Sequence, residues 1–280
     1  MASILDRYGI KEVADVTFYA INDDGSKGAP VLYLDTLKVS TIEETAESTD
    51  ARGGKGNAKL VTWDYGKEIN VTLQDALFSA KSLAMMYGYR GQLTAATDRT
   101  VVKSTYIRVG ANGKFPTYMM ADIYDATYGS RRAKVGAAAS GDIVAYANSG
   151  ITTMAAYDAQ GNSVTFTSSS FGADAPTGVT AGDKILVQYT QAASALRTIS
   201  INADEFPGTY YIQGDTYARS DVSGKDQFFQ FIIKKAKVTS ENTITLEAEG
   251  DPAVFDMNLT VLRPEDGEMM QLIQYDLAEV

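Results

Sequence analysis

The sequence predicts a mainly β protein that carries one packed α-helix and an inserted small β domain. Short segments rich in β-branched and aromatic residues recur along the chain, and clusters of Gly, Asn, Asp and Ser separate them. One segment, residues 72–87, has its apolar residues at helical spacing. From residue 129 to residue 182 the composition shifts toward Gly, Ala, Ser and Thr.

The N-terminal part has the pattern of a β-sheet. Segments 13–20 and 31–39 are rich in β-branched and aromatic residues, and the polar cluster 22–26 between them is typical of a hairpin turn. Strand patterns resume at 60–65 and 67–73. We therefore expect a hairpin followed by two further strands.

The hydrophobic pattern stops between these two pairs of strands, and a long loop is predicted there. Its first half is acidic and its second half is basic. Long loops in compact domains are usually functional or disordered. One interpretation is a subunit-interface loop that pairs with neighbouring copies, and the alternative is a flexible solvated loop. The candidate interface residues are Glu43, Glu44, Glu47, Asp50, Arg52, Gly53, Gly54, Lys55 and Lys59.

The predicted helix begins at Thr72, which together with Asp75 has the spacing of a capping box. Gly88 is placed to end it. The apolar residues recur at intervals of three and four, so they share one face and predict packing against a sheet. They are Leu73, Ala76, Leu77, Ala80, Leu83, Ala84 and Tyr87.

Residues 129–196 are predicted to form the inserted domain, because short strands and turns alternate there at the spacing of a small sandwich. Residues 1–128 and 197–280 then form one discontinuous domain. Segment 227–238 carries apolar residues on both faces at one end, which is typical of a central strand. A further strand is expected at 243–248.

The composition argues against catalysis. The chain has no His and no Cys, which excludes Ser-His-Asp, Cys-His and His-metal mechanisms as well as Cys-ligated metal sites. The Gly-rich segment 53–57 lacks the phosphate-loop pattern. We therefore expect no catalytic residue, no cofactor and no metal. The sequence also has no signal-peptide pattern and no apolar run long enough to cross a membrane.

The net charge of −10 is concentrated at one end of the chain. Residues 1–200 hold 20 acidic and 19 basic side chains, whereas residues 201–280 hold 15 and 6. An acidic segment repels a phosphate backbone, so binding that grips DNA is disfavoured. The alternatives are an ordinary solvated acidic surface and a face that DNA passes without sticking.

The C-terminal part contains three characteristic stretches in order: an Ile- and Lys-rich strand at 228–238, a strand at 243–256 that contains Gly-Asp-Pro, and the final strand region at 262–269. In this order they resemble the closing strands of bacteriophage major tail tube proteins. The N-terminal order of hairpin, charged loop, two strands and helix agrees with that family.

The resemblance implies a tail-tube-type β-sandwich or barrel that acts as a structural virion protein. Copies would form homo-hexameric rings that stack into a tube in the phage tail, assembled in the host cytoplasm. DNA would pass through the tube without sequence-specific binding, other tail proteins would be partners, and no membrane would be involved. Glu247 and Glu249 are candidate lumen-facing residues, and the inserted domain would lie on the tube exterior.

Two other functions stay open at this point. The chain could be another virion component, such as a capsid decoration or baseplate protein. It could instead bind or cleave carbohydrate, because acidic, aromatic β proteins host paired carboxylates. Glu247, Glu249 and Asp251 are the candidates for that chemistry, although outward carboxylates on a strand explain the first two equally simply.

Overall fold

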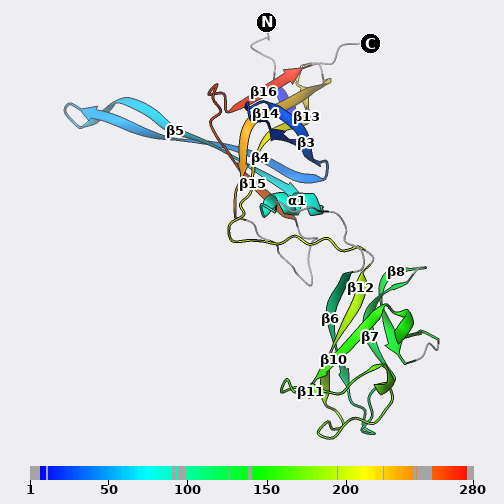
Figure 1. Cartoon of the computed structure of the whole chain (residues 1–280). Helices are drawn as coiled ribbons and strands as arrows, with labels where there is room; N and C mark the ends of the chain where they lie inside the picture. The colour runs from blue at the N-terminus through cyan, green and yellow to red at the C-terminus, as the bar shows by residue number, and fades with distance from the viewer. Residues whose placement is uncertain are drawn as a thin grey trace. The chain divides into compact units, whose positions relative to one another are not determined.

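The computed structural model describes residues 7–10, 12–89, 93, 99–125, 127–137, 141–193, 195–222, 224–241, 244 and 254–275 (Figure 1). The chain divides into two compact units. Unit 1 comprises Met1–Leu93 and Thr198–Val280, and unit 2 comprises Thr94–Arg197. The predicted mainly β fold with antiparallel sheets and one helix is confirmed.

Unit 1 contains a branched, open antiparallel sheet with the strand order β3-β2-β13-β14-β15-β5-β4. β1 adds to β13, and β16 adds to β14 beside β15. Within the described residues the sheet does not close into a barrel. The elements are β1 (Tyr8–Ile10), β2 (Asp15–Ile21), β3 (Lys27–Leu34), β4 (Leu37–Gly53), β5 (Ala58–Asp75), α1 (Ala80–Met86), β13 (Thr209–Ser220), β14 (Asp226–Val238), β15 (Phe255–Val261) and β16 (Met270–Tyr275).

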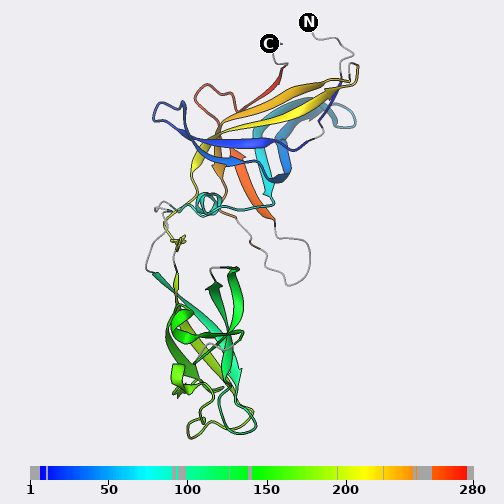
Figure 2. The same ribbon diagram turned by 90° about the vertical axis from the view of Figure 1, so that its right-hand side faces the viewer.

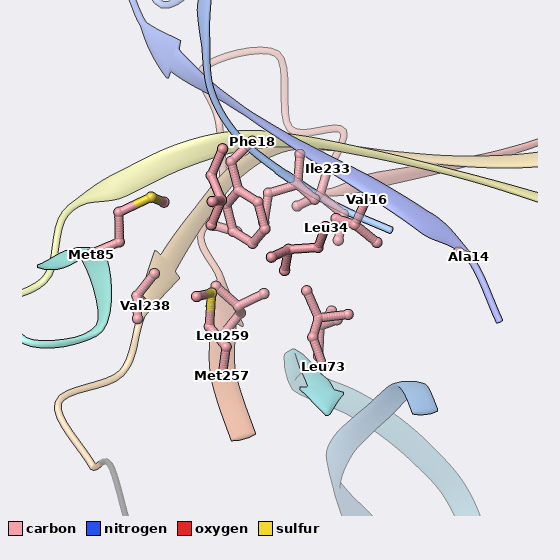
Figure 3. Packing of buried hydrophobic residues seen from close by; sticks show 14 of the residues in the cluster. Ala14, Val16, Phe18, Leu34, Leu73, Met85, Ile233, Val238, Met257 and Leu259 are labelled. Carbon is pink, nitrogen blue, oxygen red and sulfur yellow. The ribbon is translucent and has the colours of Figure 1, made fainter. Parts of the chain in front are cut away.

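The core of unit 1 is formed by side chains that are buried at every second position along its strands. Ile69, Val71 and Leu73 on β5 are buried at every second position, as the period of two in a strand requires. Figure 3 shows Val16 and Phe18 of β2 and Ile233 of β14 on one side, facing Met257 and Leu259 of β15 on the other. The sheet therefore folds over itself and encloses an apolar layer between its two branches.

Gly214 lies directly against a buried aromatic ring of this core. A Cβ atom at this position would lie 2.2 Å from the ring of Phe231, its neighbour across the β13–β14 ladder. Only glycine lets the buried ring lie flat against the strand. β13 and β14 run side by side as the yellow and orange strands of Figure 2.

The helix is shorter than predicted and begins later. Residues expected in its first turn, from Thr72 to Asp75, are the end of β5. The N-cap is Ser79, whose hydroxyl accepts a hydrogen bond from the Ser82 backbone N–H while the Ser82 hydroxyl accepts one from Ser79 N–H. Asp75 instead accepts from the Thr36 hydroxyl and the Leu77 N–H.

The buried side of the helix includes Ala84 of the predicted stripe but is centred on two methionines outside it. Met85 and Met86 lie in the core of unit 1, whereas Leu77 of the predicted apolar stripe is 64% exposed.

Unit 2 has two small sheets around its own core. One has the order β11-β10-β12-β6 and the other β7-β8-β9, in which β8 and β9 are parallel. The core residues include Ile107, Val135, Ile185 and Val187. The strands are β6 (Arg99–Arg108), β7 (Tyr118–Asp125), β8 (Gly129–Gly136), β9 (Ile143–Ala145), β10 (Ile151–Tyr157), β11 (Ser163–Val164) and β12 (Lys184–Ala193), with 3-10 turns at Tyr146–Asn148 and Ser168–Ser170.

The N-terminal edge of unit 2 lies at residue 94, not at the predicted residue 129. The reason is strand pairing across a long sequence separation. β6 pairs along its whole length with β12, and β7 pairs with β8, so both belong with the insertion.

Three of the predicted carboxylates, Glu247, Glu249 and Asp251, lie outside the described residues, as does most of the strand expected at 243–248. Among the described helices, none is long and apolar enough to span a membrane.

Candidate functional site

The most unusual feature of unit 1 is a long β-hairpin that leaves the sheet, and we call its residues 43–68 the arm. The segment predicted as a loop is in fact two paired strands, the distal parts of β4 and β5, joined by a turn at 54–57. Figure 1 shows the arm extending away from the rest of unit 1. None of its residues is buried, whereas Ile69 at its base is 3% exposed.

The length of the arm follows from strand geometry. From Ile69 to Ala58 there are eleven steps along β5, which at a rise of about 3.4 Å per residue gives a reach of roughly 37 Å. A small domain is about 30 Å across. The arm is therefore as long as a small domain is wide and can reach the surface of a neighbouring copy.

A β-bulge interrupts the arm near its middle. Thr45 is opposite Glu68 and Glu47 is opposite Tyr65, so one β4 residue faces the two β5 residues between them. One of those two is Gly66, which has a φ of 62° in the left-handed region that favours glycine. The bulge sharpens the local bend and twist of the hairpin, so Gly66 sets the direction of the outer half.

One face of the outer arm carries a row of three large apolar side chains. Val61, Trp63 and Tyr65 alternate along β5 and therefore point to the same side, and they are 48%, 55% and 52% exposed. The cross-strand neighbours of the first two are small, Ala51 and Thr49. Trp63 is the single Trp of the chain. We call Val61, Trp63 and Tyr65 the arm stripe.

The opposite face of the outer arm carries a polar network centred on Asp50. Lys59 Nζ lies 2.8 Å from one Asp50 oxygen, Arg52 lies 3.2 Å from the other, and the Thr62 hydroxyl donates at 3.0 Å. These three donors, Lys59 first, hold the pKa of the Asp50 carboxyl below its ordinary value. The two halves of the predicted charge-split loop therefore partly neutralise each other within one copy.

Other charges of the arm lie outside the Asp50 network. Glu44 pairs with Lys67 at 2.6 Å. In the part of the chain that the structure describes, Glu43, Glu47 and Lys55 form no ion pair. The predicted interface residues thus divide into an internal network and a set of charges that face solvent.

A second polar feature lies on the face of β2 and β13 that points away from the core. Asp15 and Asp215 are directly opposite in the strand register, an arrangement of like charges that destabilises a sheet. The Tyr33 hydroxyl donates to Asp15 at 3.2 Å, and Gln230 donates to Asp215. Partial desolvation of the hydroxyl, followed by the charges of Asp15, Asp35 and Asp215, raises the pKa of Tyr33, although the residue as a whole is 56% exposed. We call Asp15, Asp35 and Asp215 the acidic patch.

Among the described residues, no three Asp or Glu side chains gather in a group that could hold a metal ion.

Comparison with known families places these features in context. The model of the YomU/Tube protein family matches residues 8–114 and 124–274, which include the whole arm and most of both units. The chain belongs to the YomU/Tube protein family. The predicted kinship with phage tube proteins is thereby confirmed. No curated protein matches the sequence.

The YomU/Tube family name indicates a phage tube structural protein and hence a component of the virion tail. The description is that of a structural family and names no enzymatic activity.

Sequence reasoning missed the arm stripe. Segment 60–65, in which Val61, Trp63 and Tyr65 alternate with Thr62 and Asp64, was predicted only as a strand. Such a pattern normally marks a face packed on the protein's own core. The exposure of this face on an extended hairpin is set by tertiary structure, so the alternation alone could not reveal it.

Proposed function

We propose that copies of this YomU/Tube protein assemble through the arm into rings, and that the rings stack into a tail tube through which DNA passes. The observation that carries the proposal is the arm itself, a two-stranded hairpin with both faces exposed and an aromatic stripe on one of them.

An isolated two-stranded hairpin is only marginally stable in water and gains stability from a covering surface. Exposed apolar patches on a soluble chain also favour contact with another protein surface. A second copy is the partner that the family description supports. The arm would meet a different surface on that copy, and such heterologous contacts generate rings or open filaments.

The finer details of the assembly come from the resemblance to tail tube proteins. It supports six copies in a ring, contact with other tail proteins, and a place for the inserted unit 2 on the tube exterior. The solvent-facing members of the predicted interface set, such as Glu43, Glu47 and Lys55, would lie at the contact between copies, while the Asp50 network would hold the arm in shape.

For the passage of DNA, we propose that acidic side chains face the lumen. The acidic patch of Asp15, Asp35 and Asp215 joins Glu247 and Glu249 as a candidate, because carboxylates repel phosphate and prevent DNA from adhering. The like-charge pair of Asp15 and Asp215 costs sheet stability, and a functional requirement for negative charge on this face accounts for it.

Electron microscopy of the purified full chain tests the main proposal. Negative-stain images over a range of protein concentrations should show stacked rings or tubes, with light scattering rising in parallel. A protein that stays monomeric at every concentration, salt and temperature would refute self-assembly. Single closed rings that never stack would favour a baseplate or other virion role.

Co-pelleting with short duplex DNA tests the lumen assignment. Wild-type tubes should leave the DNA in the supernatant. Tubes of the Asp15→Lys, Asp215→Lys variant should retain it, with retention falling as salt rises. If the two kinds of tube retain DNA equally, the acidic patch does not face the lumen.

A further inference from the structure

A groove of about 450 Å³ opens on unit 1 between the turn joining β2 to β3 and the segment that precedes β16. Figure 2 shows the blue β2–β3 turn and the brown segment that follows β15 near each other in the upper unit. We call this cavity the groove. It is lined by residues 21–25 of the turn, Lys234 and Lys235 of β14, and residues 264–266.

One wall of the groove is fixed by an ion-pair network. Lys234 Nζ contacts both Asp266 and Glu268, and Gln271 donates to Glu268 at 2.7 Å. Hydrogen bonds to Asp266 and then Glu268 raise the pKa of Lys234 to about 12. The segment is thus held to the sheet before any partner arrives, which lowers the entropy lost on binding.

Two carboxylates of the groove are available to meet a partner. Asp23 and Glu265 make no ion pair with any residue that the structure describes. The lining as a whole carries four carboxylates against two ammonium groups. It is a mixed-charge surface with a negative balance.

The end of the arm has the opposite balance. Arg52, Lys55 and Lys59 outnumber Asp50 there, and Lys55 sits at the turn between Gly54 and Gly56 without an ion-pair partner among the described residues. Glycines on both sides leave the lysine as the only long side chain of a narrow turn. The tip can therefore enter a groove that a broader loop would not fit.

We propose that the tip of the arm of one copy docks into the groove of another copy, with Lys55 beside Asp23 and Glu265. This inference rests on the proposed self-assembly and names its acceptor surface. The tip extends away from its own unit, so the contact is between copies (Figure 1). Because arm and groove are different surfaces, the contact is heterologous and propagates from copy to copy.

Disulfide trapping tests the contact directly, since the chain contains no cysteine. The full-length Lys55→Cys, Glu265→Cys variant, oxidised after tubes have formed, should give a ladder of covalent multimers on a denaturing gel. Each single variant should give at most dimers. Lys55→Cys combined with Ser104→Cys, an exposed position in unit 2, is the matched control and should give no ladder.

A charge exchange provides an independent measurement. Lys55→Glu should raise the protein concentration needed for tubes by about tenfold, because one favourable exposed ion pair becomes a repulsion. Adding Glu265→Lys should restore assembly to within about threefold of wild type. Lys38→Glu, the same charge change at the base of β4, should have no effect on assembly.

The two proposals fail in different ways. Tubes that form normally but give no ladder from the 55–265 pair, and that tolerate Lys55→Glu, would overturn the groove as acceptor while leaving self-assembly intact. A wild-type chain that never forms rings or tubes would overturn the proposed function itself.

Discussion

Replacing Trp63 with alanine is the sharpest test of the arm stripe. The side chain is 55% exposed, and a Trp buries about 150–250 Å² when fully covered, so an interface would cover a further 80–140 Å² or about 2–3.5 kcal/mol. Trp63→Ala should therefore raise the concentration needed for tube formation roughly 30- to 300-fold. The stability of the monomer should change by less than about 1 kcal/mol, since the substitution lies at an exposed surface.

Sedimentation of tubes across a concentration series measures the first quantity, and urea unfolding of the monomer measures the second. Tyr106→Ala is a matched control, because Tyr106 is a 66% exposed strand aromatic outside the arm. In the wild type, Trp63 is also an internal probe, since it is the single Trp and its emission should shift to the blue as the indole leaves water.

The reasoning is refuted if Trp63→Ala and wild type assemble at the same concentration. It is also refuted if the Trp63 emission is the same in monomers and tubes, because the indole would then remain in water after assembly. A loss of assembly accompanied by a comparable loss of monomer stability would show that Trp63 supports the fold of the arm instead of a contact between copies.

Three further outcomes are expected. Gly214→Ala should lower the free energy of unfolding by about 1–3 kcal/mol in urea titrations, because its methyl group would overlap a buried phenylalanine ring. Ser79→Ala should cost about 1 kcal/mol by the same measurement, since the helix loses its N-cap. Lys234 lowers the pKa of Asp266 and of Glu268, so their ion pairs stabilise the segment before β16 fully at any pH above the ordinary carboxyl pKa of about 4. This stabilisation should be lost progressively as the pH falls below that point, measured as faster proteolysis of the segment.

The strands of unit 1 that face a core were predictable, because burial imposes a period of two on the sequence. Ile69, Val71 and Leu73 illustrate this, and so does the alternation of Phe231 and Ile233 on β14. The same pattern misplaced the helix start, since Leu73 fits both a strand ending in β5 and a helical stripe. The actual capping box is formed by Ser79 at the N-cap and Ser82 at N3. A Ser at N3 is a weaker sequence signal for a helix start than the acidic Asp75, which stands three residues after Thr72.

The arm could not be recognised from the sequence for a different reason. Residues 43–59 show no apolar alternation because neither face of the outer hairpin contacts a core in the single chain. Backbone pairing with β5 fixes the strand there, and backbone hydrogen bonds leave no trace in side-chain pattern. The boundary of unit 2 was misplaced similarly, because the pairing of β6 with β12 joins residues about 80 positions apart.

The acidic residues of β4 influence how two arms can pair during assembly. β4 is the last strand in the sheet order, so within the described residues its outer edge is unpaired, and a long open edge is prone to pair with an identical edge. Glu43, Glu44 and Glu47 lie along that edge, so two such strands brought together would place like charges side by side. Symmetric pairing of two β4 edges is thereby disfavoured, which favours a contact with a different surface of the next copy. In a contact between two different surfaces, each copy keeps one of the two surfaces free for the next copy. Contacts of this kind can therefore continue along a stacked tube.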